Sequence, residues 1–128
     1  MSDGETASPS PLVLVVDDEA ILRLLAADVL EEHGFRVVEA EDAEAALKVL
    51  AEQPDVRVLF TDINMPGPLD GLDLAREVHA RWPAIKLVVT SGRLRLLEEE
   101  IPDSGRFVAK PYSPGTLVEE IRQATDET

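Results

Sequence analysis

The stretch VRVLFTDINMPGPLDG, residues 56–71, passes from an apolar run through a polar loop to the start of a helix. The apolar residues predict a strand over 56–61 that ends at Asp62. They do not alternate with polar residues, which is typical of a strand buried on both faces. Pro66 and Pro68 punctuate the loop that follows. This unit of strand, polar end, loop and helix indicates the fold of the whole chain.

The same unit recurs along the sequence. Short apolar runs rich in β-branched residues predict further strands, and amphipathic stretches between them predict helices. The expected strands cover residues 12–16, 35–40, 56–61, 85–90 and 106–109. The expected helices cover residues 19–34, 43–53, 70–82, 93–101 and 113–124.

Several side chains indicate how these helices begin, end and pack. Asp42 and Ser113 are the expected N-caps of the second and last helices, and Gly34 is the expected stop of the first. Apolar residues recur at the spacing of one helix face. They are Ile21, Leu22, Leu25 and Val29 in the first helix, Ala46, Leu47 and Leu50 in the second, and Leu72, Ala75 and Val78 in the third.

Strands that alternate with helices predict an α/β fold in which helices cover both faces of a parallel sheet. We therefore expect a doubly wound α/β domain over residues 11–126. Right-handed crossovers leave few strand orders, and in the order 2-1-3-4-5 strands one and three are neighbours. A chain of 128 residues suits one such domain. We expect a disordered tail over residues 1–10 and fraying over residues 124–128.

Composition excludes several kinds of partner. The net charge of −14 argues against direct contact with nucleic acid or anionic membranes, and it suits a cation or a partner with a basic patch. The same charge also simply promotes solubility. The absence of cysteine excludes disulfides and thiolate chemistry and fits a reducing compartment. We find no signal peptide and no bilayer-spanning run, so we expect a cytoplasmic protein.

Polar side chains gather where the expected strands end. Asp17 and Asp18 follow the first strand, Asp62 follows the third, Thr90 ends the fourth and Lys110 follows the fifth. The carboxyl ends of parallel strands lie at one edge of a sheet, where such folds bind ligands. With strands one and three as neighbours, we expect the three carboxylates to converge.

Converging carboxylates need a cation, because two of them about 4 Å apart repel by roughly 4 kcal/mol at an effective dielectric of about 20. Oxygen ligands without His or Cys favour Mg²⁺, Mn²⁺ or Ca²⁺. A carboxylate beside a metal, a hydroxyl and an ammonium group is suited to phosphoryl transfer. The end of the second strand, Glu39-Ala40-Glu41, is interpreted instead as a solvated turn.

The motifs VVDDE (15–19), FTDINMP (60–66), LVVTSG (87–92) and FVAKPY (107–112) together resemble the receiver domain of two-component response regulators. The resemblance extends over about residues 12–124 and implies a flavodoxin-like (βα)5 fold with strands in the order 2-1-3-4-5. It implies that Asp62 is the phosphoacceptor.

The resemblance also implies a Mg²⁺ site. Asp18 would bind the ion directly, Asp17 mainly through water, and Asn64 through its backbone carbonyl, with Asp62 completing the set. Lys110 would contact the phosphoryl group.

Two further residues match the switch of the family. Thr90 matches the hydroxyl that turns toward the phosphoryl group, and we prefer it to Ser91 because it directly follows the apolar run. Phe107 matches the aromatic residue coupled to that hydroxyl. The bond between Lys110 and Pro111 is expected to be cis.

The implied function is that of a stand-alone, CheY-like receiver. A histidine kinase or a histidine phosphotransfer protein would phosphorylate it. The face made by the fourth helix, fifth strand and fifth helix would then signal to a partner protein, or the chain would act as a phosphate shuttle or sink. We expect a monomer or weak homodimer, and no enzyme activity beyond its own phosphorylation and dephosphorylation.

Three features depart from the family pattern. The loop over 65–71 is one residue longer than usual, so we expect a changed pocket rim. The stretch after Thr90 is short and contains Pro102 and Gly105, which predicts a short or irregular fourth helix. Gly92 stands two residues after Thr90, where relatives have larger side chains, and leaves the site open to water.

Two alternatives belong to other classes. One is a receiver-like module that binds proteins without being phosphorylated. The other is a Mg²⁺-dependent phosphatase with an aspartyl-phosphate intermediate. Such phosphatases need an Asp-x-Asp pair, and here Asn64 stands in the second position.

Overall fold

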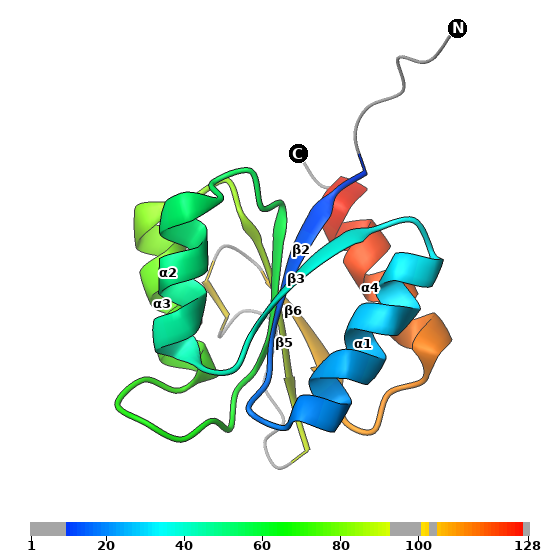
Figure 1. The fold of residues 1–128 in the computed structure, drawn as a ribbon, viewed down its shortest axis with the longest axis horizontal. Coiled ribbons are helices and arrows are strands. Elements are labelled where there is room, and N and C mark those ends of the chain that lie inside the picture. Colours follow the sequence, from blue (N-terminus) through cyan, green and yellow to red (C-terminus); the bar gives the residue numbers. More distant parts are fainter. Residues whose placement is uncertain (1–9, 93–100, 103–104, 127–128) are drawn as a thin grey trace, which may run out of the picture.

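The structure is a computed structural model that describes residues 10–92, 101–102 and 105–126. Five parallel strands form one sheet in the order β3-β2-β4-β5-β6, and helices lie on both faces (Figure 1). The strands are β2 (Leu12–Val16), β3 (Arg36–Ala40), β4 (Val58–Asp62), β5 (Lys86–Ser91) and β6 (Arg106–Ala109). The helices are α1 (Ala20–Glu32), α2 (Ala43–Glu52), α3 (Gly71–Arg81) and α4 (Pro114–Asp126). The predicted fold class and strand order are confirmed.

Some expected segments fall partly outside the described residues. The expected tail over 1–10 lies outside them except for Ser10, and the expected helix over 93–101 lies outside them except for Ile101, which is buried. Helix α4 continues to Asp126, so the expected fraying from Ala124 onward is wrong up to that residue.

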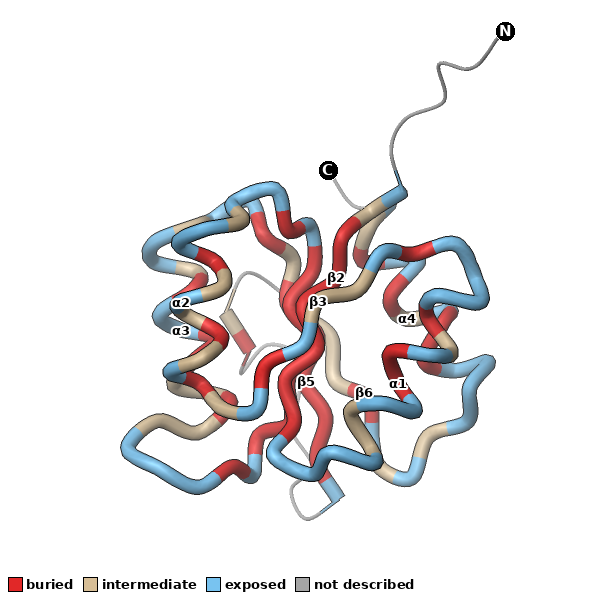
Figure 2. The backbone as a smooth tube through the Cα atoms, viewed as in Figure 1, coloured by how far each residue is buried: buried red, intermediate tan, exposed pale blue. Residues whose placement is uncertain are grey.

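Two clusters of buried apolar side chains lie on opposite faces of the sheet. One joins the sheet to α2 and α3, and the other joins it to α1 and α4. Figure 2 shows the buried strands in the centre, with helices on either side. Side chains along a strand alternate between the two faces. In β5, Leu87 and Val89 accordingly face α2 and α3, whereas Val88 faces α1 and α4. This alternation decides which polar side chains at the strand ends can meet.

The helix starts follow the sequence signals. The side chain of Asp42 accepts a hydrogen bond of 2.8 Å from the Ala45 N–H, and Ser113 Oγ accepts one of 3.0 Å from the Thr116 N–H. Both predicted caps are confirmed. At the start of α3, Asp70 forms a reciprocal capping box with Asp73.

Helix α1 differs from the others because it exposes large apolar side chains. Its buried residues are Ala26, Ala27 and Leu30. Ile21, Leu24 and Leu25 are 73%, 50% and 56% exposed, and they are the large apolar residues that the described part of the chain leaves in solvent. Four apolar residues mark one face of this helix in the sequence. Two of them, Ile21 and Leu25, do not face the core.

No helix among the described residues combines the length and the apolar character that crossing a bilayer would require.

Candidate functional site

The three predicted carboxylates meet at the carboxyl edge of the sheet. Asp17 directly follows β2, and Asp62 is the last residue of the neighbouring strand β4. Both are 5% exposed, whereas Asp18 is exposed. One oxygen from each of the three carboxylates lies within 4.8 Å of the others. The predicted convergence is confirmed.

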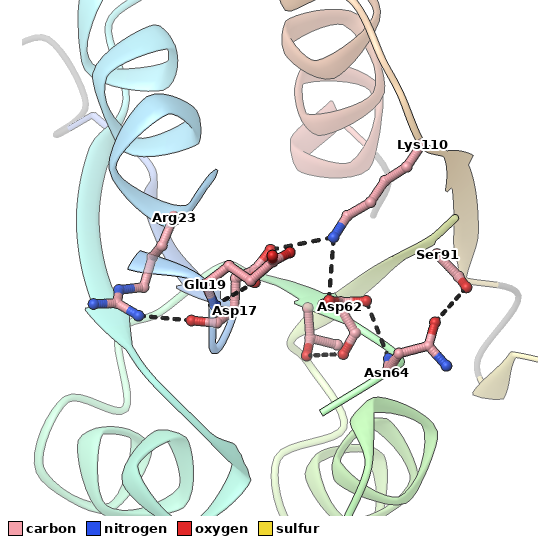
Figure 3. A network of polar contacts seen from close by, with 8 residues as sticks. Asp17, Glu19, Arg23, Asp62, Asn64, Ser91 and Lys110 are labelled. Atoms are coloured by element: carbon pink, nitrogen blue, oxygen red, sulfur yellow. Dashed lines mark hydrogen bonds and ion pairs between the residues drawn. The ribbon is translucent and has the colours of Figure 1, made fainter. Parts of the chain in front are cut away.

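Lys110 reaches this cluster from the end of β6 (Figure 3). Its Nζ atom lies 3.1 Å from Asp62 Oδ2 and 3.4 Å from Asp17 Oδ2. Burial alone would lower the pKa of Lys110, but its hydrogen bond to Asp62 and the charges of Asp17 and Asp62 outweigh burial and raise that pKa. Burial raises the pKa of Asp17, even though the Glu19 N–H and Lys110 act in the opposite direction. Lys110 is thus kept protonated, whereas ionisation of Asp17 costs free energy because its side chain is buried.

The oxygens at this edge fit a hard divalent cation. The donor set consists of Asp17, Asp18 and Asp62. Asp18, Asp62 and Asn64 line a cavity of about 660 Å³. No His or Cys competes in that set, and oxygen donors of this kind are the ones Mg²⁺ prefers. An acidic triad of this kind is typical of the Mg²⁺ site of receiver domains.

The loop after β2 is held by contacts that sequence reasoning missed. The Glu19 N–H donates a hydrogen bond of 2.9 Å to Asp17 Oδ1. Arg23 donates one of 2.7 Å to the Asp17 carbonyl oxygen, and its Nε pairs with Glu39 Oε1 at 3.1 Å (Figure 3). Glu39 is exposed, as the interpretation as a solvated residue requires, but it belongs to β3 and not to a turn. No local pattern signals this pair, because its partners are 16 positions apart on different elements.

The loop after β4 depends on Gly71, the first residue of α3. A Cβ atom at this position would lie 2.0 Å from the carbonyl oxygen of Asp62. The Gly71 N–H donates a hydrogen bond of 2.9 Å to the Ile63 carbonyl, and the Asn64 N–H donates one of 3.1 Å to Asp62 Oδ1. Only glycine allows the helix to start this close to the strand end, and the approach helps fix the Asp62 backbone.

The loop over residues 65–71 touches two cavities, and Met65 and Asp70, near its ends, line the acidic one. Pro66, Gly67, Pro68 and Leu69 lie beside the start of α2, where they line a small separate cavity. Gly67 takes up the turn with a φ of 103°. Whether the rim differs from that of relatives stays a prediction.

The two hydroxyls at the end of β5 face opposite ways. Thr90 shares the face of Val88, toward α1 and α4, and its Oγ1 is buried without a hydrogen-bond partner among the described residues. Ser91 shares the face of Val89 and is 2% exposed, and its Oγ donates a hydrogen bond of 2.7 Å to Asn64 Oδ1 (Figure 3). Both hydroxyls thus reach the carboxyl edge on different sides of the sheet.

The aromatic residue expected in the switch lies on the Ser91 side. Phe107 pairs with Val89 across the sheet and packs, half-buried, against the cluster that joins the sheet to α2 and α3. The bond between Lys110 and Pro111 is cis, as the resemblance implies.

An apolar groove of about 560 Å³ adjoins the acidic cavity. Its lining includes Leu22, Leu25, Val29, Tyr112, Pro114 and Leu117. Gly92 and Lys110 line both the groove and the acidic cavity. A partner lying in the groove would therefore contact the wall of the acidic cavity.

Known proteins match this arrangement along nearly the whole chain. The family model for the response regulator receiver domain matches residues 13–122. The chain is 36% identical over 118 residues to the hydrogenase transcriptional regulatory protein HoxA of Cupriavidus necator, and the match covers 89% of this chain but only 24% of HoxA. It is 31% identical over 115 residues to the chemotaxis protein CheY1 of Helicobacter pylori, which covers 85% of this chain and 92% of CheY1.

A solved structure agrees with these sequence matches. The crystal structure of a response regulator receiver protein from Pseudomonas putida superposes with a TM-score of 0.80 at 34% identity, over 91% of this chain and 99% of that one. The family match, the parallel sheet and the acidic cluster beside Lys110 agree, and this chain belongs to the CheY-like response regulator receiver domains.

Proposed function

We propose that this chain, as a domain over residues 11–126, receives a phosphoryl group on Asp62 and passes the signal to a partner protein. The observation that carries this proposal is the convergence of Asp17, Asp18 and Asp62 with Lys110 from three different strand ends. Receiver domains are signalling modules rather than enzymes that turn over a separate substrate, and histidine kinases phosphorylate them.

Each residue of the cluster has a distinct part in the proposed transfer. An oxygen of Asp62 bonds to phosphorus as the phosphorus–nitrogen bond of a protonated phosphohistidine breaks, and neutral imidazole leaves. Asp17, Asp18, Asp62 and the backbone carbonyl of Asn64 would hold Mg²⁺, which supplies positive charge beside the phosphoryl oxygens. Lys110, already 3.1 Å from Asp62, offsets the remaining charge.

We assign the switch hydroxyl to Ser91 rather than to Thr90. Ser91 lies on the same face of the sheet as Phe107, whereas Thr90 lies on the opposite face. A hydroxyl can be coupled to an aromatic side chain by packing only when both occupy one layer of the fold. With this assignment Gly92 directly follows the switch residue. Gly92 lines both the acidic cavity and the apolar groove and places no side chain between them.

The donor is a protein helix that lies in the apolar groove beside α1. The groove adjoins the acidic cavity and is lined by the exposed Leu25, and Ile21 and Leu24 of the same helix are also exposed. Exposed apolar patches of this kind mark sites of protein contact. The net charge of −14 favours a donor whose contact surface is rimmed by Lys and Arg, and the lack of cysteine fits a cytoplasmic setting.

Phosphorylation by a small donor tests the proposal directly. The protein is incubated with acetyl phosphate and Mg²⁺, and its intact mass is measured, with the Asp62→Asn variant as the control. We expect one phosphoryl group on the wild-type chain and none on the variant. Labelling elsewhere, or no labelling at high donor concentration, would contradict the proposal.

A second measurement separates a working switch from a receiver-like binding module. Beryllofluoride with Mg²⁺ imitates the phosphoryl group on a carboxylate. We expect the NMR resonances of Ser91 and Phe107 to shift when it binds. Binding at Asp62 without a change at Phe107 would favour the phosphorylation-independent module.

A further inference from the structure

The side chain of Asn64 holds the hydroxyl of Ser91 (Figure 3). The hydrogen bond from Ser91 Oγ to Asn64 Oδ1 is 2.7 Å long and joins residues 27 positions apart. The backbone N–H of Asn64 also donates to Asp62 Oδ1 at 3.1 Å. Asn64 therefore touches the proposed phosphoacceptor with its backbone and the proposed switch hydroxyl with its side chain.

A serine hydroxyl carries a single proton, so it donates one full hydrogen bond at a time. In this structure that proton is directed to the carboxamide oxygen of Asn64. A phosphoryl group on Asp62 would bring charged oxygens to the same region. Hydrogen bonds to charged acceptors are roughly twice as strong as those between neutral groups. The two acceptors compete for one donor.

We propose that the Asn64 carboxamide is a latch on the receiver switch, a positioning residue that keeps the Ser91 hydroxyl directed away from Asp62 until a phosphoryl group draws it over. This inference rests on the proposed function. Ser91 is 2% exposed, and Asn64→Ala removes the 2.7 Å hydrogen bond that its hydroxyl donates to the carboxamide. Loss of the carboxamide raises the free energy of the unphosphorylated state, and the phosphorylated state is then reached more easily.

The expected effect is a gain in affinity for the phosphoryl analogue. Asn64→Ala should bind beryllofluoride with Mg²⁺ roughly twofold to tenfold more tightly than wild type, which is the range of one net hydrogen bond. Asn64 is exposed, and its backbone groups remain in the variant, so the fold and the proposed metal contact of its carbonyl are kept. An equilibrium titration is preferred to a phosphoryl lifetime, because the side chain at this position also affects water access.

The matched control is the same substitution without the hydroxyl. In a Ser91→Ala background, Asn64→Ala should leave the affinity unchanged, and in a Ser91→Thr background, which keeps a hydroxyl, the gain should return. Urea unfolding of metal-free wild type, both single variants and the double variant gives a second cycle. There, the effect of Asn64→Ala on the free energy of unfolding should also depend on the Ser91 hydroxyl. An equal gain in the presence and absence of the Ser91 hydroxyl, or no gain at all, would overturn the latch.

These outcomes separate the latch from the proposed function. Failure of wild-type protein to bind beryllofluoride at Asp62 would overturn the proposed function itself. Normal binding by wild type without a hydroxyl-dependent gain in Asn64→Ala would overturn the latch alone.

Discussion

Lys110 Nζ lies 3.1 Å from Asp62 Oδ2, although 48 positions separate the two residues in the chain. The same atom lies 3.4 Å from Asp17 Oδ2. With Asp18 nearby, three carboxylates face one ammonium group, which leaves two negative charges. A divalent cation would balance them. The geometry therefore favours both a metal and an incoming phosphoryl group at this edge of the sheet.

The first prediction concerns the pH dependence of metal-free stability. Burial raises the folded-state pKa of Asp17 above its ordinary value of 3.8. Between pH 3.8 and the raised folded-state pKa, the folded state binds more protons than the unfolded state. The contribution of Asp17 to stability therefore falls as the pH rises through that window. Asp17→Asn should therefore be more stable than wild type at neutral pH, and the gain should disappear below the ordinary Asp pKa.

Urea unfolding with a chelator present, from about pH 3 to about pH 7, measures this difference. Added Mg²⁺ should stabilise wild type and have a smaller effect on the variant. A variant less stable than wild type at every pH would mean that the attraction of Lys110 outweighs the burial of Asp17.

The second prediction concerns the glycine behind Asp62. Gly71→Ala would place a Cβ 2.0 Å from the Asp62 carbonyl oxygen, so the backbone must move. We expect the free energy of unfolding to fall by about 1–3 kcal/mol or more. We also expect slower phosphorylation, because the Asp62 backbone shifts. Gly115→Ala is the matched control near the start of α4, where the nearest atom is 4.0 Å away. Equal stability of the two variants would contradict the close approach.

The third prediction compares the adjacent hydroxyls of β5. Thr90 Oγ1 is buried without a partner among the described residues, so Thr90→Val should raise the free energy of unfolding by about 1 kcal/mol and leave beryllofluoride binding near wild type. Ser91→Ala should weaken that binding roughly tenfold, because one charge-assisted hydrogen bond is lost. Urea unfolding and an equilibrium titration measure the two effects. The reverse pattern would return the switch role to Thr90.

The fourth prediction concerns the donor surface. Leu25 is 56% exposed at the edge of the apolar groove. Leu25→Asp should reduce the rate of transfer from a phosphorylated histidine kinase at least about tenfold relative to the rate from acetyl phosphate, because the charge disrupts an apolar contact. Glu31→Asp, a conservative change at an exposed position of α1 outside the groove lining, is the control. Equal slowing with both donors would place the effect in the acidic cavity instead.

Much of the fold could be predicted from local signals. Continuous apolar runs mark the strands, side-chain caps at Asp42 and Ser113 mark helix starts, and alternation of the two implies a parallel sheet. The carboxyl ends of such strands share one edge, so the meeting of Asp17 and Asp62 followed from their positions in the sequence. Side-chain pairs outside the acidic cluster could not be predicted. The pairing of Arg23 with Glu39 depends on how α1 lies against β3, which no local pattern encodes.

The sequence by itself determined the strands and the residues at their ends, because hydrophobic period, capping and turn chemistry act over a few neighbouring residues. The tertiary structure alone decided which hydroxyl lies on the same face of the sheet as Phe107. Thr90 and Ser91 are adjacent and both polar, and consecutive residues of a strand point to opposite faces. Only the placement of α2 and α3 on one face, together with Phe107, distinguishes Ser91 from its neighbour.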